Sequence, residues 1–276
     1  WQPISSVNAP SSRLLARAVW TGTEMIVWGG TDPLSGVTYL NNGARYNPVT
    51  NVWTSISMMN APSARIGFTA VWTGTEMIIW GGINTAVSFL DDGARYNPVT
   101  NAWLAVNSIS PNRPTARQAH AAVWSGGEMY IWGGQSVSGT TNTGSFYTPA
   151  TDSWNTISVT NAPSARFNSQ AAWVGNRLLI WSGQIVNPSL QFFSDGGLFN
   201  PATGTWSSLT LQNAPAPRTA RNVSCWNGSQ FVVWGGPNLT EGSLPVRTGG
   251  RYSPSLNAGI TIQVAQKNDL FIYAKD

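Results

Sequence analysis

The sequence predicts an all-β fold, a β-propeller made of four-stranded blades. Three observations lead to this prediction. An eleven-residue segment, WTGTEMIVWGG at 20–30, returns almost unchanged at 72–82 and in looser form at 124–134, 173–183 and 226–236. The second Trp of each copy lies at position 28, 80, 132, 181 or 234, so the sequence repeats with a period of about 50 residues. Only 9% of the 276 residues are charged, and the chain is rich in Gly, Pro and Trp, as in rigid β proteins with many turns.

Each period contains the signals of four strands in a fixed order. A short apolar strand ending in Trp is followed by a tight turn with Gly and by a second strand such as MIVW or LLIW, which ends in Gly-Gly or Ser-Gly. This pattern is typical of a β-hairpin. After a variable stretch come a third strand, a turn with Pro and a fourth strand that begins at Trp, as in GARYNPVTNVW at 43–53. Four strands per repeat correspond to one propeller blade.

The spacing of these residues resembles the kelch motif, in which a Gly pair is followed by an aromatic residue, six further residues and a Trp. The pairs are Tyr46/Trp53, Tyr96/Trp103, Tyr147/Trp154 and Phe199/Trp206. In the fifth copy, Tyr252 is followed by Gly259 at the Trp position. The resemblance covers nearly the whole chain and implies a β-propeller. It does not imply one activity, because kelch propellers include partner-binding domains, sugar-acid isomerases and oxidases.

We expect a single domain, 1–276, of four-stranded kelch blades. The expected blades lie at about 13–56, 65–107, 117–158, 166–209 and 218–256. The fifth lacks a Trp-led fourth strand, whereas WQPIS at 1–5 aligns with WTSIS at 53–57. Pairing of residues 1–6 with the strand at Arg251–Tyr252 would close a five-bladed ring and cover both edges. Six blades are the alternative, with 258–276 as a partial sixth blade instead of a C-terminal hairpin.

Composition excludes several classes of function. The net charge is only +4, and no basic stripe is interleaved with aromatic residues, so no nucleic-acid partner is expected. No apolar stretch reaches the ~20 residues that span a membrane, so no membrane insertion is expected. A single Cys (Cys225) and a single His (His120) leave no disulfide and no zinc or copper ligand set, so neither metal nor cofactor is expected. The chain lacks an initiator Met and a signal peptide, as in a mature or excised form, and we expect an extracellular or periplasmic location.

Five arginines occupy equivalent positions, five residues after the Asn of each NAP-like linker. They are Arg13, Arg65, Arg117, Arg166 and Arg218. At the mouth of a central channel, such a ring could bind a carboxylate, sulfate or phosphate. Alternatively, each guanidinium could bond to carbonyl groups of the adjoining blade and hold the interface together. A residue repeated in every blade usually serves the blade, so we expect the second role, with which the first is compatible.

Catalytic constellations are not evident. The expected innermost strands contain no Asp or Glu, whereas a glycosidase needs a pair of acids at the channel. The residue His120 begins an inner strand at the position of Ala16, Phe68 and Ser169 in other blades. We therefore expect it to be a hydrogen-bonded residue of the channel wall. A kelch-type copper oxidase would need a second His.

The loops that follow each Gly doublet differ in length and sequence between repeats, at 31–42, 83–92, 135–145, 184–197 and 237–249. On a repeated scaffold, such loops are where specificity is expected. The candidate ligand-binding residues of the loops are Tyr39, Phe89, Asp91, Asp92, Phe192, Asp195 and Glu241. The five arginines and His120 complete the candidate set.

The predicted function is a non-catalytic binding module for a protein or a glycan ligand, including an anionic one. Two alternatives remain open. The first is an enzyme acting on acidic sugars, such as a sialic acid mutarotase-like isomerase, which rests on the resemblance in fold alone. The second is a structural subunit of a bacterial surface or envelope assembly. The sequence makes no prediction about the oligomeric state.

Overall fold

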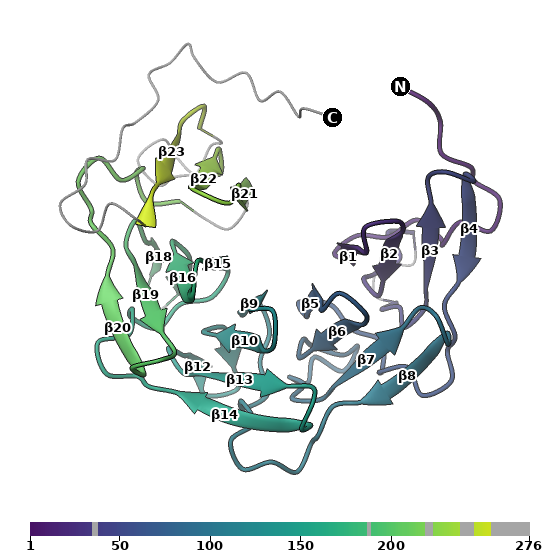
Figure 1. Ribbon diagram of the computed structural model, residues 1–276, viewed down its shortest axis with the longest axis horizontal. Coiled ribbons are helices and arrows are strands. Elements are labelled where there is room, and N and C mark those ends of the chain that lie inside the picture. Colours follow the sequence, from purple (N-terminus) through teal and green to yellow (C-terminus); the bar gives the residue numbers. More distant parts are fainter. Residues whose placement is uncertain (35–37, 187–188, 219–222, 238–245, 255–276) are drawn as a thin grey trace. The chain divides into compact units, whose positions relative to one another are not determined.

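A computed structural model describes residues 1–34, 38–186, 189–218, 223–237 and 246–254, and these residues contain no α-helix. They belong to two compact units, 1–157 and 158–276. The first unit carries three antiparallel four-stranded blades, and the second carries a fourth blade and a three-stranded fifth (Figure 1). The predicted all-β fold of five propeller blades is therefore confirmed. The tail 258–276 lies outside the described residues.

The strands of the first unit follow the predicted order in each blade. The first blade comprises β1 (Arg17–Trp20), β2 (Met25–Trp28), β3 (Gly43–Asn47) and β4 (Val52–Ser55). The second comprises β5 (Thr69–Trp72), β6 (Met77–Trp80), β7 (Gly93–Asn97) and β8 (Ala102–Ala105). The third comprises β9 (Ala121–Trp124), β10 (Met129–Trp132), β13 (Gly144–Thr148) and β14 (Ser153–Ile157), with a small hairpin of β11 (Gln135–Ser136) and β12 (Gly139–Thr140).

The second unit continues the repeat. Its first blade comprises β15 (Gln170–Val174), β16 (Arg177–Trp181), β19 (Gly196–Asn200) and β20 (Thr205–Ser208), with the small hairpin β17 (Gln184–Val186) and β18 (Leu190–Phe192). The last sheet comprises β21 (Val223–Trp226), β22 (Phe231–Trp234) and β23 (Gly249–Tyr252). In both units the first strand of each blade pairs with the second and the second with the third.

The two aromatic residues of the repeat meet across the outer strands. In the second blade, Tyr96 on β7 lies opposite Trp103 on β8, and their ring centroids are 5.0 Å apart. The Trp103 indole N–H donates to the carbonyl of Ser57, 2.9 Å away, in the linker that leaves the first blade. The side chain of Asn101 accepts from both the Tyr96 hydroxyl and the Ser57 amide. The motif therefore fastens each linker to the following blade.

The second glycine of the first three Gly doublets lies where the backbone leaves no room for a side chain. Gly82 has a φ of +102°, and a Cβ at this position would lie 2.5 Å from the carbonyl oxygen of Ile66. Only glycine adopts this backbone conformation without strain. The doublet therefore ends β6 tightly against the start of its own blade.

The expected pairing of residues 1–6 with β23 stays a prediction, because these segments belong to different units. Within the first unit, residues 1–6 are assigned to no strand. The carbonyl of Ser5 accepts from the Trp53 indole at 2.9 Å, as Ser57 does from Trp103. Residues 1–6 therefore contact the first blade in the same way as the linker 57–62 contacts the second.

Candidate functional site

The repeated arginines lie before the innermost strands and not in them, which corrects the expected strand boundaries. After Arg65, residue Ile66 pairs with Ile83 of the variable loop, and Gly67 has a φ of +66°. The inner strand β5 begins only at Thr69. Positive φ recurs at the equivalent positions Leu15, Ala119 and Asn168. This left-handed residue redirects the chain from the loop sheet into the blade, and the sequence carries no uniform signal for it.

The Arg65 side chain joins two strands of its own blade. The guanidinium group is buried, and Nη1 donates to the carbonyls of Gly81 and Asp92, at 3.1 and 3.2 Å. The Nε atom donates to the Ser63 carbonyl at 2.9 Å. The backbone, in contrast, contacts the preceding blade, where Gly30 donates to the Arg65 carbonyl. The expectation that the side chain bonds to the adjoining blade was therefore wrong, because the guanidinium group bonds to carbonyls at the end of β6 and just before β7.

The other four arginines follow the same scheme. Arg117 donates to Gly133 and Thr143, Arg166 to Ser182 and Asp195, Arg218 to Gly235 and Thr248, and Arg13 to Gly29 and Asn42. All but Arg13 are buried. Desolvation by this burial lowers the pKa of Arg117 to about 10. The geometry supports the structural role, and ligand contact by this ring stays a prediction.

The arginines on the third strands of the first two blades bond to the neighbouring blade. Arg45 on β3 donates to the carbonyl of Pro98 in the second blade, and Arg95 on β7 donates to that of Pro149 in the third, at 3.0 Å. The acids Glu24 and Glu76 of the hairpin turns approach the same two guanidinium groups, at 3.5 and 3.7 Å.

Three of the four candidate loop carboxylates are engaged in ion pairs. Asp91 bonds to Arg113 at 2.7 Å, Asp92 to Arg65 at 2.9 Å and Asp195 to Arg166 at 2.6 Å. The fourth, Glu241, lies outside the described residues. The paired carboxylates hold loops onto the scaffold, and ligand contact by them stays a prediction.

The variable loops begin as short β-hairpins that extend beyond the Gly doublets. Tyr39 pairs with Thr31, and Phe89 pairs with Ile83. In later repeats the same position holds β11–β12 and β17–β18, and Phe192 on β18 is buried. Tyr39 and Phe89 are partly buried as well. The three candidate aromatic side chains are therefore shielded, fully or in part, from solvent.

Aliphatic residues occupy the exposed parts of these loops in the first unit. The exposed fractions are 90% for Leu34, 67% for Val87 and 89% for Val137. Val87 also has a φ of +59°, which is rare for a β-branched residue and strains the backbone. None of the three was among the sequence-based candidates, which favoured aromatic and acidic residues. The loops at 31–42 and 83–92 contain other aliphatic residues as well, so the sequence does not single out Leu34 or Val87.

His120 is a buried residue with one hydrogen-bonded ring nitrogen. Its Nε2 atom lies 2.7 Å from the Thr69 hydroxyl, and its ring packs edge-on against Trp80 at 5.2 Å. The Nδ1 atom is buried without a partner among the described residues. Burial lowers the pKa of His120 well below its usual value, and the nearby charges of Arg117 and Arg17 lower it further. The imidazole is therefore neutral at neutral pH.

Replacing His120 with Phe is expected to reduce the loss of stability on mild acidification. Because the folded-state pKa is below the unfolded value of about 6.5, the unfolded chain binds the extra proton and stability falls as the pH drops below 6.5. Phe68 fills the equivalent position in the second blade and packs edge-on against Trp28, so Phe suits the site. Urea unfolding at pH 7.5 and 5.5 measures the effect. An equal loss of stability in both proteins would contradict the assignment.

The profile of the KLHDC2/KLHL20/DRC7 Kelch-repeats domain matches residues 15–236. The chain belongs to the Kelch-repeat family. Kelch propellers commonly serve as protein-interaction modules. Comparison with curated proteins gives no match.

Arg17 is a functional candidate of the Kelch chain that the sequence-based reasoning missed. It is the first residue of β1, where the other inner strands carry Thr69, Ala121 or Gln170. Its side chain is exposed, and Nε donates to the Phe68 carbonyl at 3.1 Å. The signal in the sequence was a cation at a position where the repeats otherwise place small or neutral residues.

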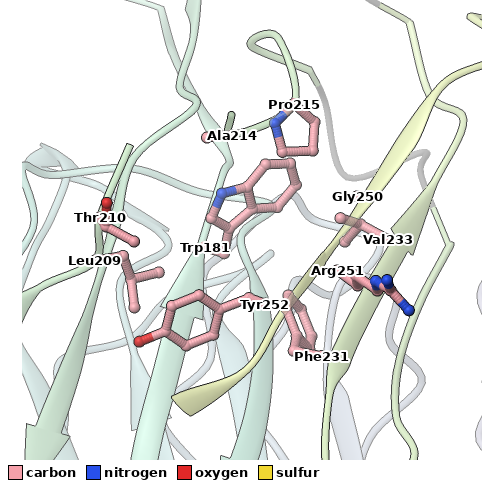
Figure 2. A pocket seen from close by; sticks show the side chains of 10 residues that line it. All are labelled: Trp181, Leu209, Thr210, Ala214, Pro215, Phe231, Val233, Gly250, Arg251 and Tyr252. Carbon is pink, nitrogen blue, oxygen red and sulfur yellow. The ribbon is translucent and has the colours of Figure 1, made fainter. Parts of the chain in front are cut away.

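A cavity in the second unit is a packing feature and not a ligand site. Figure 2 shows Trp181, Phe231, Val233 and Tyr252 among the side chains around it. Its volume is about 20 Å³, room for roughly one water molecule. In the first unit, the equivalent place against Trp28 is filled by Trp103, at a centroid distance of 5.6 Å. The corresponding residue here, Gly259, lies outside the described residues.

Two further classes of site were searched for in the described part of the Kelch chain. No group of three or more His, Cys, Asp or Glu side chains there could hold a metal ion. No helix among those residues is long and apolar enough to span a membrane. Cys225 is a free, exposed thiol.

Proposed function

We propose that the Kelch chain is a binding module that receives a protein partner on the loops after its Gly doublets. The observation that carries this proposal is the exposed aliphatic residue in the loop of each of the three blades of the first unit, Leu34, Val87 and Val137. Each is surrounded by polar loop residues, and the three occupy equivalent loops between the second and third strands. Loops that diverge on a repeated scaffold are where binding specificity is placed, and exposed aliphatic side chains there suit a protein surface.

The conformation of Val87 adds to this argument. A β-branched residue at a φ of +59° costs on the order of 1–3 kcal/mol, and such strain concentrates at binding and catalytic sites. The side chain gains nothing from burial in the free protein, since it is 67% exposed. A partner that covers Val87 would bury apolar surface and offset the strain.

The chemistry of these loops favours a protein over a glycan. Glycan sites use exposed aromatic faces and polar side chains, but Tyr39 and Phe89 are partly buried. The carboxylates of Asp91 and Asp92 are occupied by Arg113 and Arg65. What faces solvent at Leu34, Val87 and Val137 is aliphatic, and burial of aliphatic surface is the main source of affinity between proteins.

The proposal is tested with the triple variant Leu34→Ser/Val87→Ser/Val137→Ser. The matched control is Val49→Ser/Val99→Ser, because these valines are 91% and 90% exposed in the β3–β4 and β7–β8 turns at the other ends of the strands. Both variants should unfold at the temperature of the parent, since exposed substitutions usually change stability by less than about 0.5 kcal/mol.

Affinity capture from the source cells, quantified by mass spectrometry, should recover the same partner with the parent and the control. The triple variant should recover it at least about tenfold less, because three apolar anchors are lost. Equal recovery with the triple variant, or loss with the control instead, would contradict the proposal. A glycan partner would appear as recovery that is abolished by a glycosidase and unchanged in the triple variant.

A further inference from the structure

We propose that the side-chain amide of Asn227 converts without an enzyme to a carboxylate, in a reaction with the backbone of Gly228. The two residues lie in the turn between β21 and β22 of the second unit (Figure 1). They form one of two Asn-Gly dipeptides in the chain, and the other is Asn42–Gly43. The environments of the two dipeptides differ, and only the first is arranged to react.

Gly228 offers an unhindered nucleophile. Asn227, Gly228 and Ser229 are all exposed. Gly228 has a φ of +94°, and no heavy atom lies within 4 Å of the place where a Cβ would stand. Its backbone nitrogen has no hydrogen-bond acceptor among the described residues. The nitrogen can therefore lose its proton to water and turn toward the Asn227 side chain with little resistance.

Three donors surround the side-chain carbonyl oxygen of Asn227. The Oδ1 atom accepts from the Ser229 amide at 3.0 Å, from the Ser229 hydroxyl at 3.0 Å and from the Gln230 amide at 2.7 Å. These bonds fold the side chain over the Gly228 peptide. When a nucleophile adds to Cγ, negative charge develops on Oδ1, and donors already in place stabilise that charge. The turn therefore lowers the barrier to addition at this amide.

The reaction balances with water as its only co-reactant. The Gly228 nitrogen bonds to Cγ of Asn227, the Cγ–Nδ2 bond breaks, and ammonia leaves with the proton that the Gly228 nitrogen carried. Water then opens the resulting five-membered imide at either of its carbonyl groups. Opening on one side gives Asp, and opening on the other gives isoaspartate, in which the chain runs through the side-chain carbon.

The dipeptide Asn42–Gly43 has the same sequence but is held in place. The Asn42 carbonyl accepts from the Gly29 amide and from Arg13, at 3.1 and 3.0 Å, and Arg13 also bonds to Oδ1. Gly43 is buried in β3, where a Cβ would collide with the carbonyl oxygen of Val27. Rotation of this peptide would break the pairing of β2 with β3. Only local unfolding would release it, so this amide should stay unreacted.

The two products have different effects on the hairpin. An Asp carboxylate accepts from the same three donors more strongly than the amide does, so this product keeps the turn and adds a negative charge. Isoaspartate lengthens the backbone by one carbon atom, which displaces the Asn227 amide from the Gln230 carbonyl, its partner at 3.1 Å. Accumulation of isoaspartate should therefore loosen β21 from β22 at their turn.

Ageing of the purified protein in H₂¹⁸O at mildly alkaline pH tests the site. Water that opens the imide leaves ¹⁸O in the product, so mass spectrometry of peptides distinguishes new acid from any acid already present. In the native protein, Asn227 should convert at least about tenfold faster than Asn42, because Asn42 reacts only after unfolding. In urea, where both dipeptides are exposed, the two rates should become similar.

Two variants separate the parts of the argument. Asn227→Thr should produce no acid at this position and should fold as the parent does, because Thr21 and Thr73 accept from the same turn amides in the first two blades. Ser229→Ala removes only the hydroxyl donor and should slow conversion about threefold, the effect of one exposed hydrogen bond. Conversion of Asn227 no faster than that of Asn42 in the native protein, or an unchanged rate in Ser229→Ala, would overturn the proposal.

Discussion

Replacing Arg117 with Met is expected to lower the free energy of unfolding by about 3 kcal/mol. Methionine fills a similar volume but has no donor for the carbonyl oxygens of Gly133 and Thr143, which the guanidinium binds at 3.0 and 2.9 Å. The Thr115 carbonyl and hydroxyl lose their bonds as well. Equilibrium unfolding in urea measures the difference.

Arg17→Met is the matched control for this substitution. It removes the same side chain from an exposed residue of the first blade, with a single hydrogen bond lost. The expected change is below about 0.5 kcal/mol. If the two substitutions had equal effects, the buried arginines would not be the elements that join the strands of each blade.

Replacing Trp80 with Ala is expected to cost about 3–5 kcal/mol, the range for removing a fully buried aromatic side chain. The Trp80 indole contacts both His120 and Trp154, and its ring centroids lie 5.2 and 5.7 Å from theirs. These contacts join the second blade to the third. The cavity left by the substitution would therefore weaken an interface as well as a blade, and thermal unfolding should show a clear decrease in midpoint.

The first Trp of the same eleven-residue repeat provides the comparison. Trp20 is 54% exposed, whereas Trp80, a second Trp, is fully buried. Trp20→Ala should therefore cost less than about 1 kcal/mol. A larger effect at Trp20 than at Trp80 would show that the two tryptophans of the repeat have been assigned the wrong roles.

The repeated residues made the fold predictable. The inner hairpin recurs in five copies and the aromatic/Trp pair in four, and each has the same physical role wherever it occurs, so the copies supported one interpretation. The arginines show the limit of this reasoning. Their repetition indicated a structural role, but whether Arg65 reaches Gly81 of its own blade or the adjoining blade depends on a left-handed turn at Gly67, where other repeats carry Leu15 or Ala119.

The candidate site was less predictable, because single residues in single copies carry it. Asp91 and Asp92 looked like recognition residues, but their partners Arg113 and Arg65 are distant in sequence and neutralise them. Nothing in the sequence distinguishes Val87 from other valines, and only its backbone conformation and exposure identify it as a candidate. Identifying Arg17 as a candidate required knowing that β1 begins at this residue, four residues after the repeated Arg13.

The central claim is that the repeated residues build the blades and the divergent loops bind the partner. Amide hydrogen exchange of the complex with the captured partner tests this claim most directly. The prediction is slower exchange on binding at 84–90 and 135–141, where Val87 and Val137 lie, and unchanged exchange in the repeated turns 47–51 and 97–101. Protection confined to those repeated turns, with the loops unaffected, would contradict the account.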